Sequence, residues 1–459
     1  MKTMLSTTPQ LIVADSLFVP HDLGDGLVLR FATPADVEAL AQFNGHIHGD
    51  EHPDHFDPMV VAWTRDFLSE QHPTCGPSNV TLVEDTRMGT LRVVSTMCLI
   101  PQTWTYAGIP FEVGRPEAVG TDPDYRRRGL IRAQFDVLHA KSAAMGHLVQ
   151  GITGIPWYYR QFGYEYALDL DNGRRTHWAS IPALKEGETE LYRLRPMTLD
   201  DLPLVKALYE QDCARSLVAC PRPDWLWHTL LEWYSPDSFE RRRFQIIETT
   251  EGCAVGYLAP HREIWDDKFM IDEFAVVEGA TLRPVVLSAL RALGPIAEAE
   301  TAVQKKTFRW LLWRLGREHP VYDAIPELLQ NPRPPYGWYI RVADVPGFLR
   351  HIAPALEVRL AQSVMAGYTG EIHINEYQGG FKMVWDKGRL VSAEPWQHVI
   401  GQRDDNAGFS PLVFLQLLFG RASIMELRTF YPDCWASDEA AVLLDALFPK
   451  QCSRVIPLG

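Results

Sequence analysis

The chain has 459 residues, too many for a single hydrophobic core, and this length indicates about three domains. Apolar residues make up 46% of the sequence and charged residues 22%, the composition of an ordinary globular protein, and no run of roughly 18 apolar residues predicts a membrane span. The formal net charge of −14 argues against a nucleic-acid partner, because binding phosphates requires a basic face.

The N-terminal sequence indicates where in the cell the protein is located, and the cysteine spacing indicates whether it has disulfides or a metal site. Lys2 is followed by a mixed polar and apolar run without the features of a secretory signal. The seven cysteines are scattered and form no C-x-x-C pair, so neither a disulfide framework nor a zinc site is predicted. We expect a cytoplasmic protein without a metal and without a membrane partner.

After an N-terminal extension (1–26), the first predicted domain covers 27–185. Its long helix is the best-defined element, because Ile131, Phe135, Leu138 and Met145 share one face and Gly146 ends it. The other elements, in chain order, are a strand at 27–31, a helix at 34–44, strands at 80–84, 90–100 and 115–121, the helix at 129–145, a strand at 148–153, a helical turn at 157–161 and a strand from 164. This order predicts a twisted mixed sheet with helices on both faces.

A short internal repeat marks the second predicted domain, at 190–345. The pattern L-R-x-x-T-x-x-D at 29–36 recurs at 194–201, and a helical apolar pattern follows each copy. Each copy predicts a strand and then a helix with a threonine N-cap and an acidic residue three positions later. The two copies lie too far apart for a solenoid repeat. The repeat therefore indicates a duplicated domain, with chance recurrence of a short pattern as the alternative.

The last predicted domain, at 350–459, has a different pattern. Alternating strands near 371–377, 381–385 and 389–392 are joined by the turn sequences QGG at 378–380 and DKG at 386–388. Amphipathic helices are expected at 411–419 and 438–448, with Ser410 and Ser437 as N-caps. This arrangement predicts an α+β domain.

The segment VGTDPDYRRRGLIR, at 119–132, carries the strongest chemical signal. Here a strand ends, the chain turns at Asp122, and Arg126, Arg127 and Arg128 lead to Gly129 at the start of the long helix. The first turn of a helix offers free amides and the positive end of the helix dipole, and arginines add charge and forked donors. Gly129 has no Cβ, so a ligand can approach its backbone closely. The segment therefore predicts a pyrophosphate site, and the alternative is a basic loop paired with carboxylates of this acidic protein.

This segment resembles the acyl-CoA loop Q/R-x-x-G-x-G/A of the GNAT superfamily, with Ile131 where most members have Gly or Ala. WYYRQFGY at 157–164 is similar to the FYxxxGF turn of the same superfamily. Together, RRRGL followed by an aliphatic residue and this aromatic turn resemble the Eis (enhanced intracellular survival) group. The resemblance implies α/β and α+β folds: two tandem GNAT-like domains, each a mixed sheet flanked by helices, and then a sterol-carrier-protein-like α+β domain. It also implies a homo-oligomer, such as the hexamer of Eis-like proteins.

The resemblance implies an N-acetyltransferase with acetyl-CoA as co-substrate. A primary amine would attack acetyl-CoA directly in a ternary complex. Arg126, Arg127, Arg128, Gly129, Leu130 and Ile131 would bind CoA. Val119 and Thr121 would bind pantetheine through their backbones, with the Val119 N–H at the oxyanion. Tyr159 would protonate the CoA thiolate, and its alternative role is simple aromatic packing. The base stays open between the Gly459 carboxylate, Glu117 and a water relay, because this chain ends in PLG where the relatives end in an aromatic residue.

The acceptor is expected to be a small cationic molecule similar to an aminoglycoside or a polyamine, which the acidic surface would concentrate. The His- and acid-rich stretch 46–57 fits no zinc pattern; it is either a solvated loop or part of the acceptor pocket. The second domain lacks the arginine run and has Glu278 at the equivalent turn, so we expect it to bind no CoA. Two alternative functions are a hydrophobic-ligand binder with a vestigial GNAT half and a protein-lysine acetyltransferase.

Overall fold

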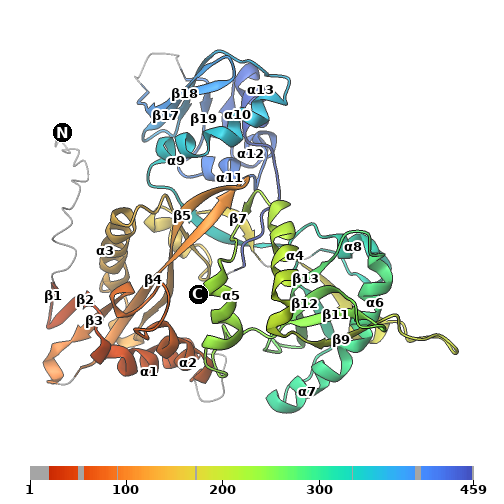
Figure 1. The fold of residues 1–459 in the computed structure, drawn as a ribbon. Coiled ribbons are helices and arrows are strands. Elements are labelled where there is room, and N and C mark those ends of the chain that lie inside the picture. The colour runs from red at the N-terminus through yellow and green to blue at the C-terminus, as the bar shows by residue number, and fades with distance from the viewer. Residues whose placement is uncertain are drawn as a thin grey trace.

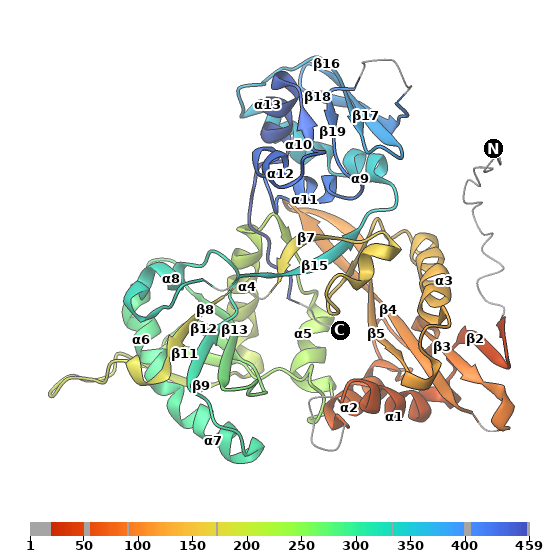
Figure 2. The ribbon, with the colours of Figure 1, turned by 180° about the vertical axis from the view of Figure 1, so that it is seen from behind.

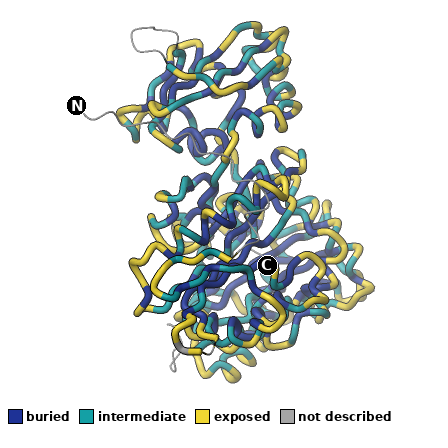
Figure 3. Tube along the Cα trace, turned by 90° about the vertical axis from the view of Figure 1, so that its left-hand side faces the viewer, coloured by how far each residue is buried: buried dark blue, intermediate teal, exposed yellow. Residues whose placement is uncertain are grey.

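The computed structural model describes residues 20–49, 56–89, 91–170, 173–332, 334–398 and 405–456. These residues form three lobes, two below and one above in the view of Figure 1 and again in the reverse view of Figure 2. Each lobe is built on its own sheet. Buried segments run through the middle of every lobe and exposed segments lie at its edges (Figure 3). None of the described helices is long and apolar enough to cross a membrane.

The first sheet lies in the lobe built mainly from the N-terminal third of the chain. Its strands, in spatial order, are β1 (His21–Gly24), β2 (Leu27–Phe31), β3 (Val80–Asp85), β4 (Val93–Tyr106), β5 (Ile109–Thr121), β6 (Val149–Ile152), β15 (Tyr336–Arg341) and β7 (Glu165–Leu170), and β10 (Val218–Ala219) pairs with β4. The predicted strands and the long helix are present. The strands β4 and β5 are longer than expected and form one extended hairpin.

Helices cover both faces of the first sheet. Met97 and Leu99 of β4 pack in one cluster with Phe135 of α3 (Leu130–Ala144). Cys98 and Ile100, which alternate with them, pack on the other face. Alternate residues of a strand point to opposite faces, so α3 lies across the sheet from α1 (Val37–Ile47) and α2 (Pro58–Phe67), whose side chains belong to the second cluster.

The second sheet has the spatial order β8 (Arg174–His177), β14 (Trp310–Trp313), β13 (Lys268–Val276), β12 (Ala254–Pro260), β11 (Gln245–Thr249) and β9 (Tyr192–Pro196). Five α-helices accompany it: α4 (Leu202–Ala214), α5 (Asp224–His228), α6 (Leu282–Ala292), α7 (Gly294–Gln304) and α8 (Pro320–Ala324). The helix α6 follows β13 through a short turn, just as α3 follows β5 in the first lobe.

The internal repeat of the sequence forms the same polar structure in both lobes. In each copy an arginine on the first strand binds the acidic residue at the start of the following helix and a glutamate on the next strand, and a threonine completes a capping box. The pairs are Arg30 with Asp36 and Glu84, both at 2.8 Å, and Arg195 with Asp201 and Glu248, both at 2.7 Å. The two copies of the motif therefore share a three-dimensional structure as well as a sequence pattern. A chance recurrence of a short pattern would not produce this shared structure.

The two lower lobes exchange strands. β7 and β8 follow one another in the chain, yet β7 lies in the first sheet and β8 pairs with β14 in the second. After the second lobe the chain returns as β15, which inserts between β6 and β7 of the first sheet. Figure 2 shows β15 crossing from one lobe to the other. The sequence pattern did not indicate this exchange, because each strand fits either sheet equally well by its periodicity.

The third sheet has the order β18 (Arg389–Pro395), β17 (Gly380–Asp386), β16 (Gly370–Asn375), β19 (Ala407–Gly408) and β20 (Trp435–Ala436). Its helices are α9 (Val345–His351), α10 (Ala353–Ala361), α11 (Phe414–Leu418), α12 (Ile424–Phe430) and α13 (Asp438–Leu447). Ser437 caps α13 as predicted. Ser410 does not cap α11: the helix begins later, at Phe414, because Leu412 has a left-handed φ of 72° that no helix accommodates.

Candidate active site

The central feature of the site is a wedge between β5 and β6. These parallel strands pair at only two positions, Val113 with Val149 and Gly114 with Gln150. From Arg115 to Thr121 the edge of β5 that faces β6 has no strand partner among the described residues. The backbone groups of this edge are therefore available to an extended ligand, and unpaired backbone groups favour such a partner.

A β-bulge shapes β5 at the wedge. Thr96 pairs with Gly120 and Cys98 pairs with Glu117, so Ala118 and Val119 both lie opposite Met97. Ala118 has a left-handed φ of 51°, which is uncommon for a residue with a Cβ. Bulges turn the backbone locally and are frequent next to active sites. This bulge directs the half-buried Val119 and the following Thr121 along the wedge.

The loop from β5 to α3 is held in place by Asp122 and Tyr125. The Asp122 side chain accepts a hydrogen bond from the Asp124 amide at 2.9 Å. Tyr125 is buried and donates to Asp85 at 2.6 Å, and the guanidinium of Arg128 lies 5.1 Å from its ring centre. These contacts fix both ends of the arginine run.

The arginine run has no ion-pair partner among the described residues. Arg126, Arg127 and Arg128 are exposed, and within the described ranges no carboxylate lies within ion-pair distance of any of them. Arg126 donates only to the Thr121 carbonyl, at 3.3 Å. In a chain with a net charge of −14, three such arginines side by side form an unneutralised cationic site. The alternative of a loop paired with carboxylates therefore does not describe this segment.

The start of α3 adds free donors to these charges. Gly129 precedes the helix with a φ of 78°, a conformation that glycine adopts without strain, and no side chain caps the helix. The amides of Leu130, Ile131 and Arg132 donate no backbone hydrogen bond to any residue that the structure describes. Arg127 is also left-handed, with a φ of 65°. Left-handed residues beside a helix N-terminus form concave sites in which successive amides bind an anion.

Tyr159 lies in the short 3₁₀ helix Tyr158–Phe162, which follows β6. Its ring is only 3% exposed and packs between Phe135, Tyr164 and Tyr339. Its hydroxyl makes no hydrogen bond to any residue in the described part of the chain. Burial, and then the nearby Glu117 charge, raise the pKa of Tyr159 far above the usual range of tyrosine. The phenol therefore stays protonated at any physiological pH and can act as a hydrogen-bond donor.

The neighbouring tyrosines differ from Tyr159. The Tyr164 hydroxyl lies 2.8 Å from His139 Nε2, so its polar group already has a partner. Burial lowers the pKa of His139 to about 3, so the imidazole is neutral at physiological pH. Tyr158 is half-buried, with a pKa raised by burial. Among these three tyrosines, Tyr159 alone combines a buried ring with a hydroxyl that has no partner among the described residues.

Glu117 and Arg115 form a pair on β5 beside the bulge. Arg115 is almost completely buried, and one of its guanidinium nitrogens lies 2.7 Å from Glu117, whose side chain is 33% exposed. The Arg115 guanidinium lies over the ring of Trp338 on β15, 5.1 Å from its centre. Sequence reasoning missed Arg115 and Trp338, because nothing local distinguishes a buried arginine or tryptophan that approaches the site across the fold.

The C-terminal segment passes close to this pair. Trp338 donates through its indole nitrogen to the Val455 carbonyl at 3.1 Å. Ile456 packs against the hydrophobic cluster that contains Ala118 of the bulge. Figures 1 and 2 show the C-terminal segment running from the upper lobe down between the two lower lobes. Gly459, one candidate for the base, lies outside the described residues.

Part of the His- and acid-rich stretch 46–57 also lies outside the described residues. Among its described members, Asp57 caps α2 by accepting from the amides of Met59 and Val60, and the ring of His46 contacts Phe56. Within the described ranges, no group of three or more His, Cys, Asp or Glu residues could hold a metal ion.

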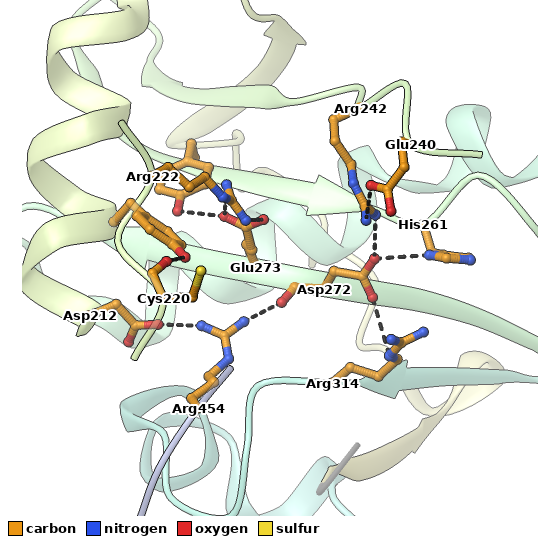
Figure 4. A network of polar contacts seen from close by, with 12 residues as sticks. Asp212, Cys220, Arg222, Glu240, Arg242, His261, Asp272, Glu273, Arg314 and Arg454 are labelled. Carbon is orange, nitrogen blue, oxygen red and sulfur yellow. Dashed lines mark hydrogen bonds and ion pairs between the residues drawn. The ribbon is translucent and has the colours of Figure 1, made fainter. Parts of the chain in front are cut away.

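The second lobe differs at the equivalent place. β13 and β14 pair over four positions, from Lys268 to Ile271 on β13. Directly beyond, Arg454 of the C-terminal segment binds the backbone carbonyl of Asp272 and the carboxylate of Asp212 (Figure 4). Glu278 of the following turn accepts from Gln211 at 3.1 Å. A side chain of the protein itself thus occupies the strand edge that is open in the first lobe.

Asp272 is the centre of a wider ionic network in this lobe. Its carboxylate contacts two arginines and a histidine, and the next residue of β13, Glu273, pairs at 2.6 Å with Arg222 of the loop before α5 (Figure 4). The groups around Asp272 are His261 at 2.9 Å and Arg242 and Arg314, each at 3.3 Å. The positive charges of Arg314 and Arg242, together with the contact with His261, outweigh the desolvation of the carboxyl and hold its pKa well below the usual range of aspartate. The groups of this network are engaged with one another rather than available to a ligand.

Comparison with known proteins supports the class that the wedge and the loop indicate. Residues 29–167 match the family model described as an acetyltransferase (GNAT) domain. This match covers the wedge, the arginine run and Tyr159, and it supports an acyl-CoA N-acyltransferase. No curated protein matches the sequence.

Solved structures share the fold over most of the chain. A probable N-acyltransferase from Enterococcus faecalis V583 is 14% identical, with a TM-score of 0.66 over 94% of this chain and 99% of that one. A GCN5-related N-acetyltransferase from Anabaena variabilis ATCC 29413 is 16% identical, with a TM-score of 0.59 over 94% and 99%. Eis1 from Mycobacterium abscessus is 16% identical, with a TM-score of 0.56 over 93% and 98%. The predicted fold class, tandem mixed α/β domains followed by a C-terminal α+β domain, is confirmed.

Proposed function

We propose that the protein transfers an acetyl group from acetyl-CoA to the primary amine of a small cationic molecule, in a ternary complex. One observation carries the proposal: the open wedge of β5 leads directly into an uncapped helix N-terminus and three arginines that have no ion-pair partner among the described residues. A strand edge followed by an anion site fits an extended amide-containing arm that ends in a pyrophosphate. Pantetheine joined to the nucleotide of CoA has this chemistry.

The residue roles follow from this orientation. Arg126, Arg127 and Arg128, together with the amides of Gly129, Leu130 and Ile131, would hold the pyrophosphate. The backbones of Val119 and Thr121 would hold pantetheine, with the Val119 N–H facing the oxyanion that forms on the thioester carbonyl. The bulge at Ala118 supports this role, because it turns the backbone at the point where the thioester would lie.

The chemistry requires two proton movements. The neutral amine attacks the thioester carbonyl, a C–N bond forms, and a base takes the proton of the resulting ammonium. The C–S bond then breaks, and Tyr159 gives its proton to the departing CoA thiolate. Glu117, next to the bulge and partly exposed, is one candidate base, and the Gly459 carboxylate and a water relay are the others.

The acceptor class rests on charge. The chain has a net charge of −14, and the acidic residues of the stretch 46–57 follow α1 in the sequence. A negative surface raises the local concentration of cationic acceptors. The acidic groups of this stretch would then favour an amine that carries further positive charge.

An acetyl-CoA turnover assay against aminoglycosides, polyamines, amino acids and peptides tests this function. We expect turnover with at least one cationic small molecule and one CoA bound per chain. Turnover confined to peptides would instead favour a protein-lysine acetyltransferase. No turnover and no CoA affinity, with lipid retained in native mass spectrometry, would favour the hydrophobic-ligand binder.

A further inference from the structure

The loop that leads into the Tyr159 helix has an irregular backbone and little packing of its own. It spans residues 153–157, between β6 and the 3₁₀ helix. Gly154 has a φ of 106° and Trp157 a φ of 66°, a rare conformation for so bulky a residue. Ile155 is 50% exposed and Trp157 67% exposed, so neither side chain is held in the core. A backbone of this shape needs polar partners from elsewhere.

Three tyrosine hydroxyls supply those partners. Each binds one backbone group of the loop, and two of the tyrosines lie on β15, which the chain reaches only after the whole second lobe. The contacts are Tyr336 to the Gly154 carbonyl, Tyr339 to the Ile155 carbonyl at 3.2 Å, and the Trp157 amide to the Tyr166 oxygen at 3.2 Å. We call Tyr166, Tyr336 and Tyr339 the tyrosine clamp.

The clamp is internally consistent as a hydrogen-bond network. The Tyr166 and Tyr339 oxygens are 2.5 Å apart, and the two rings stack with centres 3.9 Å apart. Each hydroxyl has a single proton. The Tyr339 hydroxyl lies within donating distance of both the Ile155 carbonyl and the Tyr166 oxygen. Tyr166 accepts from the Trp157 amide and donates to Tyr336 at 3.4 Å. Removing the Tyr339 hydroxyl takes this donor away from the Ile155 carbonyl and removes one of the hydrogen bonds of Tyr166.

Tyr339 also contacts Tyr159 directly. The two rings meet edge to face, with centres 5.3 Å apart, and the helix that carries Tyr159 begins immediately after Trp157. Tyr339 therefore fixes Tyr159 in two ways, by supporting its ring and by holding the loop that starts its helix. β15, on which Tyr339 lies, pairs with both β6 and β7, so its position relative to the wedge is set by strand hydrogen bonds (Figure 2).

We infer that Tyr339 is a positioning residue for acetyl transfer, which acts through Tyr159 by holding the loop 153–157. This inference rests on the proposed role of Tyr159 as the proton donor. It also gives the second lobe a part in the reaction, because the chain of that lobe delivers β15 to the first sheet.

The test compares the turnover of Tyr339→Phe, Tyr159→Phe and the double variant. Phenylalanine keeps the ring contact with Tyr159 and removes only the hydroxyl. We expect Tyr339→Phe to lower kcat about 10- to 100-fold, because small misplacements of a reacting group have effects of this size. The KM for acetyl-CoA should change less than about 2-fold, since the arginine run is untouched. The double variant should be no slower than Tyr159→Phe alone, because Tyr339 then has nothing to position.

Tyr322→Phe is the matched control. The Tyr322 hydroxyl is also buried and donates to a loop carbonyl, that of Gly316 at 3.1 Å, but it lies in the second lobe. This variant should keep full turnover. Hydrogen exchange gives a readout that does not depend on activity. The amides of residues 153–155, 157 and 158 should exchange faster in Tyr339→Phe and in Tyr336→Phe, and at the normal rate in Tyr322→Phe.

The outcomes separate this inference from the proposed function. Full turnover of Tyr159→Phe contradicts the role of Tyr159 itself. A slow Tyr159→Phe with a fully active Tyr339→Phe overturns only the positioning role. A double variant slowed by the product of the two single effects would show that Tyr339 acts independently of Tyr159, which also overturns the inference.

Discussion

Tyr159 combines a ring inside an aromatic cluster with a hydroxyl that no described residue uses. We expect Tyr159→Phe to lower kcat by a factor of about 10² to 10⁴ with little change in the acetyl-CoA KM, because the phenol acts only when the thiolate leaves. Steady-state kinetics together with a thermal melt would check this. Tyr158→Phe and Tyr164→Phe are the controls and should stay active; the second should lose about 1 kcal/mol of stability with its bond to His139.

The raised pKa of Tyr159 predicts the alkaline side of the pH profile. Burial holds this pKa far above the ordinary value of tyrosine, so the neutral donor form persists as the pH rises. We expect kcat to show no decrease that depends on Tyr159 between pH 7 and about pH 10. The ratio of the wild-type kcat to the kcat of Tyr159→Phe should not change with pH over this range. A ratio that falls with a midpoint near pH 8 or 9 would contradict the assignment.

At the scale of elements, the turn between β5 and α3 joins a strand edge, a cationic loop and a helix N-terminus in one continuous segment. We expect Arg126→Ala combined with Arg127→Ala to weaken acetyl-CoA binding by about 2–4 kcal/mol, because charge-assisted contacts to the pyrophosphate are lost. Isothermal titration measures this directly. Its control is Arg283→Ala, at the start of α6, where the arginine already pairs with Glu327. Unchanged affinity in the double variant, or two CoA per chain, would contradict the site.

The strand exchange is the second feature at this scale. β8 and β15 each complete the sheet of the other lobe, so the two lobes share hydrogen-bonded strands as well as a packed interface. Lobes joined in this way are expected to unfold together, since separating them breaks strand pairing in both sheets. The strand exchange therefore links the stability of the second lobe to the geometry of the wedge.

At the scale of the molecule, three buried histidines and the half-buried His139 predict sensitivity to acid. Burial lowers the pKa of His139 to about 3 and those of His72, His147 and His319 to about 4. The unfolded chain binds protons near pH 6.5 whereas the folded chain stays neutral there, so stability falls as the pH drops from about 6.5 to about 4. Each such histidine adds up to about 1.4 kcal/mol per pH unit to this loss. Denaturant titrations at several pH values would measure the slope, and constant stability between pH 7 and pH 5 would contradict it.

Assembly is the remaining prediction at this scale. By resemblance to hexameric Eis-like proteins, we propose that the chain forms a homo-oligomer. Light scattering at micromolar concentration should report a multiple of the mass of one chain. A mass equal to one chain would contradict this, without affecting the active-site proposals.

The sequence by itself determined the local parts of the protein. The strand, turn, arginines and Gly129 before α3 could be read from residue order, because caps, turns and left-handed glycines depend on a few neighbouring residues. The duplication could be read as well, because Arg30 and Arg195 each lie in the same short motif. The late start of α11 was missed, because the left-handed Leu412 leaves no mark in the hydrophobic pattern.

Only the tertiary structure decided which distant residues meet. Trp338 lies under Arg115, Tyr339 supports Tyr159, and Arg454 occupies the edge of β13, although each partner is far away in the chain. These contacts follow from the exchange of β8 and β15 and from the path of the C-terminal segment. Strand periodicity records which face of a strand is buried but not which sheet the strand joins, so packing between the lobes made that choice.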